Sequence, residues 1–304
     1  MTSSVLRNDR HTDAPTATPR LRNWALRRPL TTFLVLAFSL AYGLMAVLYL
    51  AHRRTIPGRS VIDQLPIPID EFAGLLMVLS LFPAALYVTW ASEGRPGVGR
   101  LVRRATRWRV HFGWWLLVFL ALPALTTGMA LVAGDSLRHV SPVRVFLSQL
   151  VLLAINFIAT NLWEETSWAG FLQTRLERRH NLLVAAVLTA VPFAFMHLPL
   201  QLFLGPVSAT SLLFGLLAYF ILGLLFRPML AVFLRGTGDS VLLVALLHSV
   251  FNRTGNENGI AAALTDGNAH GLTLLIAVLL LTTATAVAIR PRLTRAHRHY
   301  LDQL

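Results

Sequence analysis

The sequence contains no cysteine and no lysine. The absence of cysteine excludes disulfides, thiolate metal ligands and a cysteine nucleophile. Charged residues of either sign are scarce, at 13% of the 304 residues, where a soluble domain carries roughly a quarter. All 27 basic residues are arginine, a bias that we take to indicate a bacterial genome of high GC content.

Where charged residues are scarce, the sequence contains long hydrophobic runs. Hydrophobic residues make up 55% of the chain, and the mean hydropathy is +0.60. The runs are near the roughly 20 residues that a helix needs to cross a bilayer. We therefore predict an all-α polytopic membrane protein with about eight transmembrane helices in contact with the lipid bilayer. The predicted spans are 30–51, 71–92, 112–133, 144–171, 182–204, 211–234, 240–252 (short for a full span) and 271–289.

The net charge of +13 does not indicate a nucleic-acid partner, because the arginines gather in short connectors between apolar runs. Arginine accumulates on the cytoplasmic side of membrane proteins. Basic and neutral connectors alternate along the chain, so eight spans place both termini in the cytoplasm and the protein in the cell membrane. The basic segments are 1–28, 93–111, 173–181 and 290–298.

The composition and the predicted spans divide the chain into three parts. Residues 1–28 are polar and basic, which predicts a disordered cytoplasmic tail. Residues 29–290 form the predicted transmembrane domain, whose motif-bearing core is 144–252. Residues 291–304 are predicted to be a second basic cytoplasmic tail.

Polar residues inside three successive apolar segments are the strongest functional signal. They are Glu164 and Glu165, then His197, then His248 with Asn252. Ionisable groups at membrane depth cost a few kcal/mol, so they usually face the protein interior and serve a function. Adjacent glutamates on a helix point about 100° apart and have different roles, whereas His248 and Asn252, four residues apart, share a face.

A carboxylate and a histidine on one cavity can activate a water molecule, and a second histidine with an asparagine can stabilise an oxyanion. Counted from Phe171 and residue 182, however, Glu164 is about 10 Å deep and His197 about 22 Å. Their convergence therefore requires the fifth segment to tilt, to kink at Pro192 or to begin later.

Other interpretations remain open at this point. Glu164, His197 and His248 could bind a catalytic zinc ion, although the His-Glu-x-x-His motif is absent. The polar side chains could belong to a non-catalytic scaffold or immunity protein that sequesters a peptide. They could also relay protons in a transporter, but the second half of the chain does not repeat the first, as transporter repeats would.

The spacing resembles the CPBP family of CAAX proteases and bacteriocin-processing enzymes, also called Abi. The resemblance is carried by Glu-Glu-x-x-x-x-Gly-Phe at 164–171, Phe-x-x-x-His at 193–197 and His-x-x-x-Asn at 248–252. It implies a hydrolase, an intramembrane glutamate endopeptidase that needs no metal cofactor and has eight helices around a cytosol-facing cavity. Its substrate would be a peptide or membrane protein, cleaved near the cytosolic membrane surface.

The resemblance also implies the role of each site residue. Glu164 and His197 would activate the catalytic water, and His248 and Asn252 would form the oxyanion site. The first motif of the family usually reads Glu-Glu-x-x-x-Arg, but Ala169 stands at the arginine position here. Glu165 is therefore expected to lack its usual partner, so that either a more distant arginine, Arg175 or Arg253, replaces it or the Glu165 carboxyl stays protonated.

Overall fold

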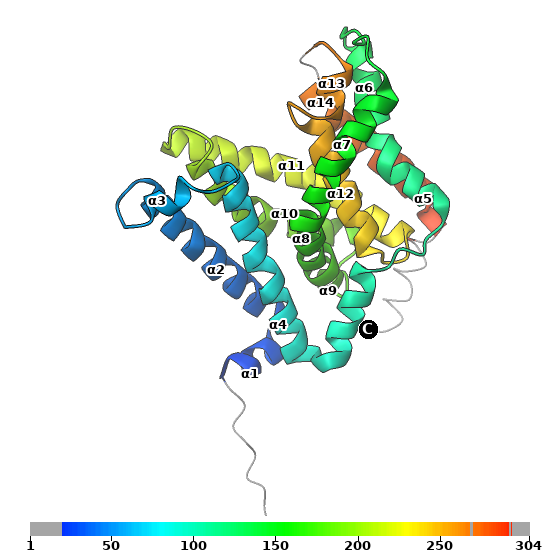
Figure 1. Cartoon of the computed structure of the whole chain (residues 1–304). Coiled ribbons are helices and arrows are strands. Elements are labelled where there is room, and N and C mark those ends of the chain that lie inside the picture. The colour runs from blue at the N-terminus through cyan, green and yellow to red at the C-terminus, as the bar shows by residue number, and fades with distance from the viewer. Residues whose placement is uncertain (1–19, 268–269, 292, 294–304) are drawn as a thin grey trace, which may run out of the picture.

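The computed structural model describes residues 20–267, 270–291 and 293, and this part of the chain is helical (Figure 1). Its only β-structure is an isolated bridge between Leu137 and Thr265. Within the described residues, seven helical segments are long and apolar enough to cross a membrane. This confirms the all-α polytopic prediction. The segments are Pro29–His52, Ile69–Ala105, Phe112–Val132, Pro142–Leu176, Leu182–Leu202, Ala209–Gly236 and Gly271–Ala288.

The segment predicted at 240–252 is the shorter helix α12 (Val241–Gly255), as its length suggested. It packs against helices from both halves of the chain, including α4, α7, α8 and α11. The other elements of the first half are α1 (Arg20–Arg27), α2 (Pro29–His52), α3 (Arg59–Ile62), α4 (Ile69–Ala105), α5 (Phe112–Leu116), η1 (Leu117–Ala121) and α6 (Leu122–Val132). Those of the second half are α7 (Pro142–Asn156), η2 (Phe157–Asn161), α8 (Leu162–Ser167), η3 (Trp168–Gln173), α9 (Thr174–Leu176), α10 (Leu182–His197), η4 (Leu198–Leu202), α11 (Ala209–Gly236), α13 (Ile260–Leu264) and α14 (His270–Ala288).

Side-chain caps fix where the site-bearing helices begin. Ser141 caps α7 and is followed by Pro142, a residue suited to the first helical turn. Asn181 accepts a hydrogen bond from the Val184 amide at the start of α10. Ser240 caps α12 and also donates to the carbonyl of Arg107, which ties the start of this helix to the connector after α4.

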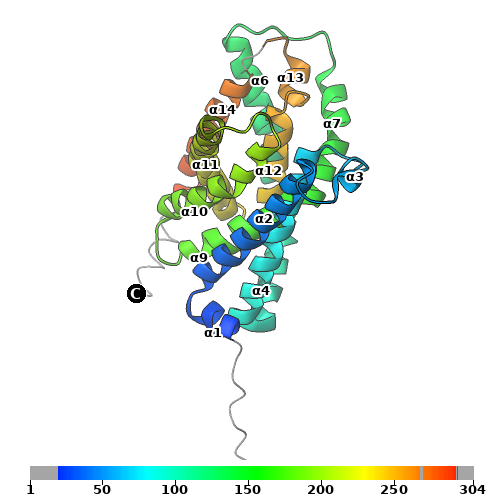
Figure 2. The ribbon, with the colours of Figure 1, turned by 90° about the vertical axis from the view of Figure 1, so that its left-hand side faces the viewer.

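Helix α12 lies inside the bundle, in contact with α4, α6, α7, α8, α11 and α14. Helices α2 and α4 pack together on one side, and α10 and α11 form a hairpin beside them (Figure 2). A Cβ atom on Gly223 of α11 would lie 3.3 Å from the Cβ of Ala190 in α10. The two helices therefore approach as closely as a glycine allows, and this approach positions the end of α10 that carries His197.

The two ends of the bundle differ in charge. One end, at the bottom of Figure 1, contains α1 and the C-terminal end of α4. There a cavity of about 260 Å³ is lined by five arginines and two acidic residues. The arginines are Arg100, Arg104, Arg175, Arg178 and Arg235, and the acidic residues are Glu93 and Asp239.

The opposite end is held by a tether between two connectors. Ser136 donates hydrogen bonds from its amide, 2.8 Å, and its hydroxyl, 2.6 Å, to the Asp266 carboxylate. These bonds hold the pKa of Asp266 below its usual value. The tether joins the connector after α6 to the connector after α13.

The predicted tails lie largely outside the described residues, but one part differs from the prediction. Residues 20–27, expected to be disordered, form α1, whose Ala25 is fully buried. Arg22 lies over the ring of Trp90, 6.0 Å from its centroid. Contacts of α1 with α2 and α4 therefore order a segment whose composition alone favours disorder. Of the predicted tail 291–304, only 291 and 293 are among the described residues.

Candidate active site

Both glutamates lie on α8, a short helix bracketed by the π-helical segments η2 and η3. Single π-helical turns inside longer helices occur frequently at functional sites. Each one shifts the register of the residues that follow it. Glu164 and Glu165 are both buried, with exposed fractions of 4% and 0%.

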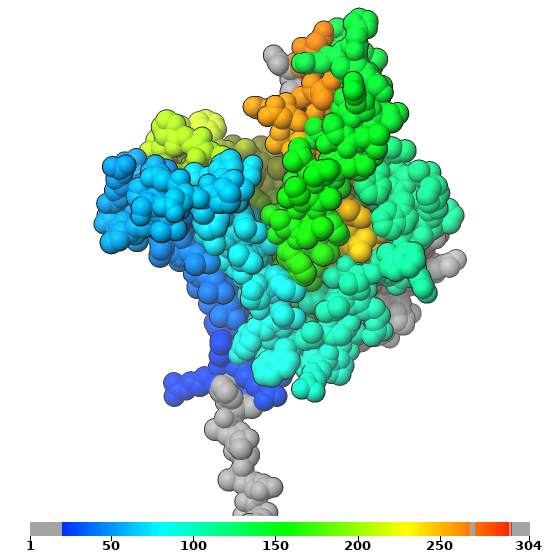
Figure 3. All heavy atoms as spheres, viewed as in Figure 1, coloured from blue at the N-terminus to red at the C-terminus, as the bar shows by residue number. Residues whose placement is uncertain are grey.

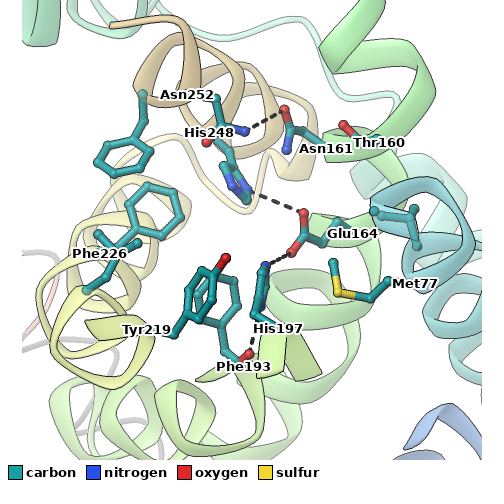
Figure 4. A pocket seen from close by; sticks show the side chains of 14 residues that line it. Met77, Thr160, Asn161, Glu164, Phe193, His197, Tyr219, Phe226, His248 and Asn252 are labelled. Carbon is teal, nitrogen blue, oxygen red and sulfur yellow. Dashed lines mark hydrogen bonds and ion pairs between the residues drawn. The ribbon is translucent and has the colours of Figure 1, made fainter. Parts of the chain in front are cut away.

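A cavity of about 280 Å³ lies beside α8 and is lined by most of the predicted site residues (Figure 4). Glu164, His197, His248 and Asn252 all line it, but Glu165 does not. This volume is at the small end of ligand-binding pockets, about 300–1,000 Å³. The remaining lining residues are Gly74, Met77, Val78, Thr160, Asn161, Phe193, Tyr219, Leu222, Phe226 and Phe251.

Glu164 and His197 face each other across this cavity. His197 Nε2 lies 3.7 Å from Glu164 Oε1, too far for a direct hydrogen bond. The other ring nitrogen, Nδ1, is 2.8 Å from the Phe193 carbonyl, which can only accept, so Nδ1 carries the hydrogen. Neutral His197 therefore presents Nε2 to the cavity as an acceptor.

The difference in depth predicted for these two residues is not found. The fourth span continues to Leu176 instead of ending at Phe171. Glu164 is thus 12 residues from the end of that span, or about 18 Å. His197 is the last residue of α10, which begins at Leu182 as predicted. The extra helical turn in the fourth span accounts for most of the discrepancy.

Glu165 points away from the cavity and has a partner that the sequence interpretation missed. Arg227 of α11 places Nη1 2.8 Å from Oε1 and 2.9 Å from Oε2 of Glu165. Both side chains are buried, with exposed fractions of 1% and 0%. The expectation that Glu165 lacks a nearby arginine is therefore wrong, because α11 supplies the cation that Ala169 cannot.

The two arginines considered as distant substitutes are engaged elsewhere. Arg175 pairs with Glu93, and Arg253 donates to the side chain of Gln149. The sequence did contain a signal for Arg227. Arg227 lies inside the sixth apolar run. A charge at this depth needs a buried partner, as the charges of the two glutamates do.

His248 is held by the Glu165–Arg227 pair. Its Nδ1 lies 2.9 Å from Glu165 Oε1 and 4.0 Å from Glu164 Oε2. An ionised carboxylate only accepts, so Nδ1 carries a hydrogen that it donates to Glu165. The orientation of His248 is thereby tied through Glu165 to Arg227.

Asn252 is positioned by an asparagine that the sequence interpretation also missed. Asn161, on η2, is buried, with an exposed fraction of 1%. Its Oδ1 accepts a hydrogen bond of 2.8 Å from Ser249 and a long one of 3.5 Å from Asn252 Nδ2. Asn161 therefore links the fourth span to α12 at the level of the cavity.

An aromatic wall completes the site. The ring of His197 lies 4.3 Å from that of Phe193 and 5.0 Å from that of Tyr219, between centroids. The ring of His248 contacts Phe226 edge-on at 4.7 Å. These contacts restrict the motion of both imidazole rings. The polar side chains of the cavity are therefore surrounded mostly by apolar side chains.

A metal ion would need several side-chain donors at one point. Among the residues that the structure describes, no group of three or more His, Asp or Glu side chains has an arrangement that could hold one.

The fold and this cavity define a polytopic membrane protein with a buried glutamate–histidine site. Residues 146–254 match the family model described as type II CAAX prenyl endopeptidase Rce1-like, which is of the CPBP type that the three motifs resemble. This match supports intramembrane endopeptidase activity in general. No curated protein and no solved structure matches the chain.

Proposed function

We propose that the chain is an intramembrane endopeptidase of the glutamate type, in which Glu164 and His197 activate a water molecule. The observation that carries the proposal is the gap of 3.7 Å between Glu164 Oε1 and His197 Nε2 on the cavity wall. A water bridging this gap would make good hydrogen bonds to both groups. Oε1 accepts no hydrogen bond from the described residues, which leaves it free to act as the base.

The reaction needs only the peptide and water. Glu164 takes one proton as the water oxygen attacks the carbonyl carbon of the peptide bond, while His197 Nε2 accepts a hydrogen bond from the second water hydrogen. Glu164 then passes its proton to the amide nitrogen, and the carbon–nitrogen bond breaks. The products are an amine and a carboxylic acid that still carries the second water hydrogen, which it releases to solvent as it ionises to the carboxylate.

When water attacks the peptide bond, the carbonyl oxygen becomes negatively charged and needs hydrogen-bond donors. His248 and Asn252 line the same cavity and can supply them. As an oxyanion donor, His248 would use Nε2, because Nδ1 already donates to Glu165. Arg227 and Asn161 act as positioning residues, because Arg227 holds Glu165 outside the cavity and Asn161, on the cavity wall, holds Asn252.

The substrate in this proposal is a peptide or a membrane protein. The resemblance implies a bond near the cytosolic membrane surface, but the chemistry at Glu164 and His197 is the same from either side. Removal of water from the surroundings of these groups strengthens their electrostatic interaction with the transition state. A site walled by Phe193 and Phe226 meets that need.

Proteolysis by the purified protein in liposomes tests the proposal, with a library of membrane peptides as substrate. Wild type is compared with Glu164→Gln and His197→Gln, each with and without a chelator. Glu71→Gln and His180→Gln are matched controls, because both residues lie outside the cavity. We expect cleavage by wild type and the controls, no cleavage by the two cavity variants, and no effect of chelator.

Other outcomes would point to other functions. Loss of cleavage with chelator would establish the zinc-dependent version with Glu164, His197 and His248 as ligands. Peptide binding without cleavage by wild type would establish a non-catalytic scaffold. Full activity of Glu164→Gln would overturn the glutamate mechanism.

A further inference from the structure

The cavity lined by arginines is separate from the candidate active site. Its volume is about 260 Å³, and it shares no lining residue with the candidate active-site cavity. Its walls are the C-terminal end of α4, segments η3 and α9, and the C-terminal end of α11. Figure 3 shows the end of α4, in cyan, at the lower surface of the molecule. Because three apolar helical segments end around it, the cavity lies at the level of the lipid headgroups.

The charges that line this cavity do not balance. Five arginines face two acidic residues, Glu93 and Asp239, and a third acidic residue, Glu177, pairs with Arg235 from outside the lining. The cavity therefore carries an excess of two positive charges. Three of the arginines share Glu93, namely Arg100, at 2.7 Å, Arg175, and Arg178, at 3.9 Å. Since each guanidinium has five N–H donors, most of the donors of these three arginines are not used by Glu93.

The guanidinium of Arg104 has one edge without a partner. Its Nη1 donates a hydrogen bond of 2.8 Å to the Gly170 carbonyl, which holds the side chain on the cavity wall. Its Nε and Nη2 are buried and donate no hydrogen bond to any described residue. Asp239 lies 3.8 Å from Nη2, beyond hydrogen-bonding distance. Two adjacent guanidinium donors of this kind bind the oxygens of a carboxylate or a phosphate in pairs.

The surroundings of this edge favour a phosphate over a carboxylate. A phosphate group has more oxygens, so two can bind Arg104 while another meets a second arginine. Arg100 and Arg178 line the same cavity and are exposed, which lets them close on a ligand. The cavity volume is several times the roughly 30 Å³ that one water molecule occupies, so a phosphate group fits. Basic pockets between membrane helices are also typical sites for lipid headgroups.

We propose that the arginine-lined cavity binds a phosphate group, carried by an anionic lipid headgroup or present as the free anion. The Nε–Nη2 edge of Arg104 holds two phosphate oxygens, and Arg100 and Arg178 bind from the exposed side. The proposal does not rest on the proposed function, because no residue of the cavity takes part in the chemistry at Glu164.

Asp239 is the internal competitor of the phosphate. Its Oδ1 is buried and accepts no hydrogen bond from the described residues, yet it lies 3.8 Å from Arg104 Nη2 and 3.9 Å from Arg235 Nη1. An anion bound to Arg104 is repelled by this carboxylate. Asp239 has a φ of +69°, a conformation that asparagine also tolerates. Asp239→Asn therefore removes the charge and preserves the backbone.

Two probes distinguish the sources of the phosphate. Native mass spectrometry of the purified full chain in detergent counts bound phosphatidylglycerol, with phosphatidylcholine, which has no net charge, as the control lipid. Isothermal titration calorimetry measures the binding of inorganic phosphate at constant ionic strength, with chloride as the balancing anion. Binding of phosphatidylglycerol alone identifies a headgroup site, and binding of inorganic phosphate identifies a site open to the free anion.

Substitutions at Arg104 test the site in whichever assay detects binding. Arg104→Gln should weaken binding about tenfold or more, because hydrogen bonds to a charged group are lost. Arg104→Lys should also weaken binding, since lysine keeps the charge but lacks the paired donors. Arg103→Gln is the matched control and should bind as wild type does, because Arg103 is exposed on the same helix and lies outside the cavity. Unfolding temperatures of the same samples identify any variant that fails to fold.

Asp239→Asn gives a result that a misfolded protein cannot produce. It should tighten binding about threefold or more, because the like charge beside the phosphate is removed. Unchanged or weaker binding by Asp239→Asn would overturn the proposal, as would equal affinities of wild type and Arg104→Gln. Failure of wild type to bind either probe would overturn it as well. None of these assays involves cleavage, so failure of the endopeptidase proposal would leave their outcome unaffected.

Discussion

Arg227 and Glu165 form a buried ion pair across 62 residues of sequence, with the guanidinium Nη1 2.8 Å and 2.9 Å from the two carboxylate oxygens. The arginine usual in the first family motif is replaced by Ala169, yet the second glutamate keeps a cationic partner. This partner lies on α11 and not on the helix of the glutamates. Since His248 also donates to Glu165, this pair connects three helices behind the cavity.

Arg227→Met should destabilise the protein strongly. Removing one partner of a buried ion pair leaves an uncompensated charge and costs about 3–5 kcal/mol. The double variant Glu165→Gln/Arg227→Met should be less destabilised than Arg227→Met, because no unpaired charge remains. Thermal unfolding in detergent measures both effects, and equal unfolding temperatures for wild type and Arg227→Met would contradict the pairing.

Asn161→Ala should lower the rate of peptide cleavage with little change in KM. The substitution frees Asn252, and misplacing a catalytic group by about 1 Å can cost on the order of 10²-fold in rate. Asn156→Ala is the matched control, because Asn156 lies on the same span but does not line the cavity. Steady-state kinetics should separate the two variants; similar rates for both would show that Asn161 has no positioning role.

The sequence predicted the spans and the four polar residues that line the candidate cavity because both signals are local. Hydropathy over about 20 residues identifies a span, and Glu164, His197, His248 and Asn252 stand out as polar residues within such spans. The helix ends were less accurate, since the fourth span runs to Leu176. That error produced most of the apparent difference in depth between Glu164 and His197.

What the sequence did not reveal depends on tertiary packing. The Arg227–Glu165 contact requires knowing which face of α11 meets α8, and two π-helical segments shift that register. Asn161 looked like an ordinary polar residue within the fourth predicted span, and its role follows only from its contact with Ser249 and Asn252. Neither contact joins residues at a fixed sequence spacing, so no sequence motif could reveal it.

Gly223→Leu should destabilise the α10–α11 hairpin and displace His197. A Cβ atom at Gly223 would already lie 3.3 Å from Ala190, and overfilling a packed interface costs typically 1–3 kcal/mol. Gly43→Leu on α2 has no neighbour within 4 Å of its Cβ atom and should be tolerated. A lower unfolding temperature for Gly223→Leu alone is the expected result, and equal temperatures for both variants would show that the close approach is unimportant.

The central claim is that Glu164 is the base and Glu165 is structural. The most direct test is single-turnover cleavage of one peptide by wild type and Glu164→Gln, with unfolding temperatures measured on the same samples. General-base catalysis contributes about 10²–10⁴-fold, so Glu164→Gln should lose that much rate while unfolding at the wild-type temperature. Cleavage by Glu164→Gln at the wild-type rate would contradict the claim.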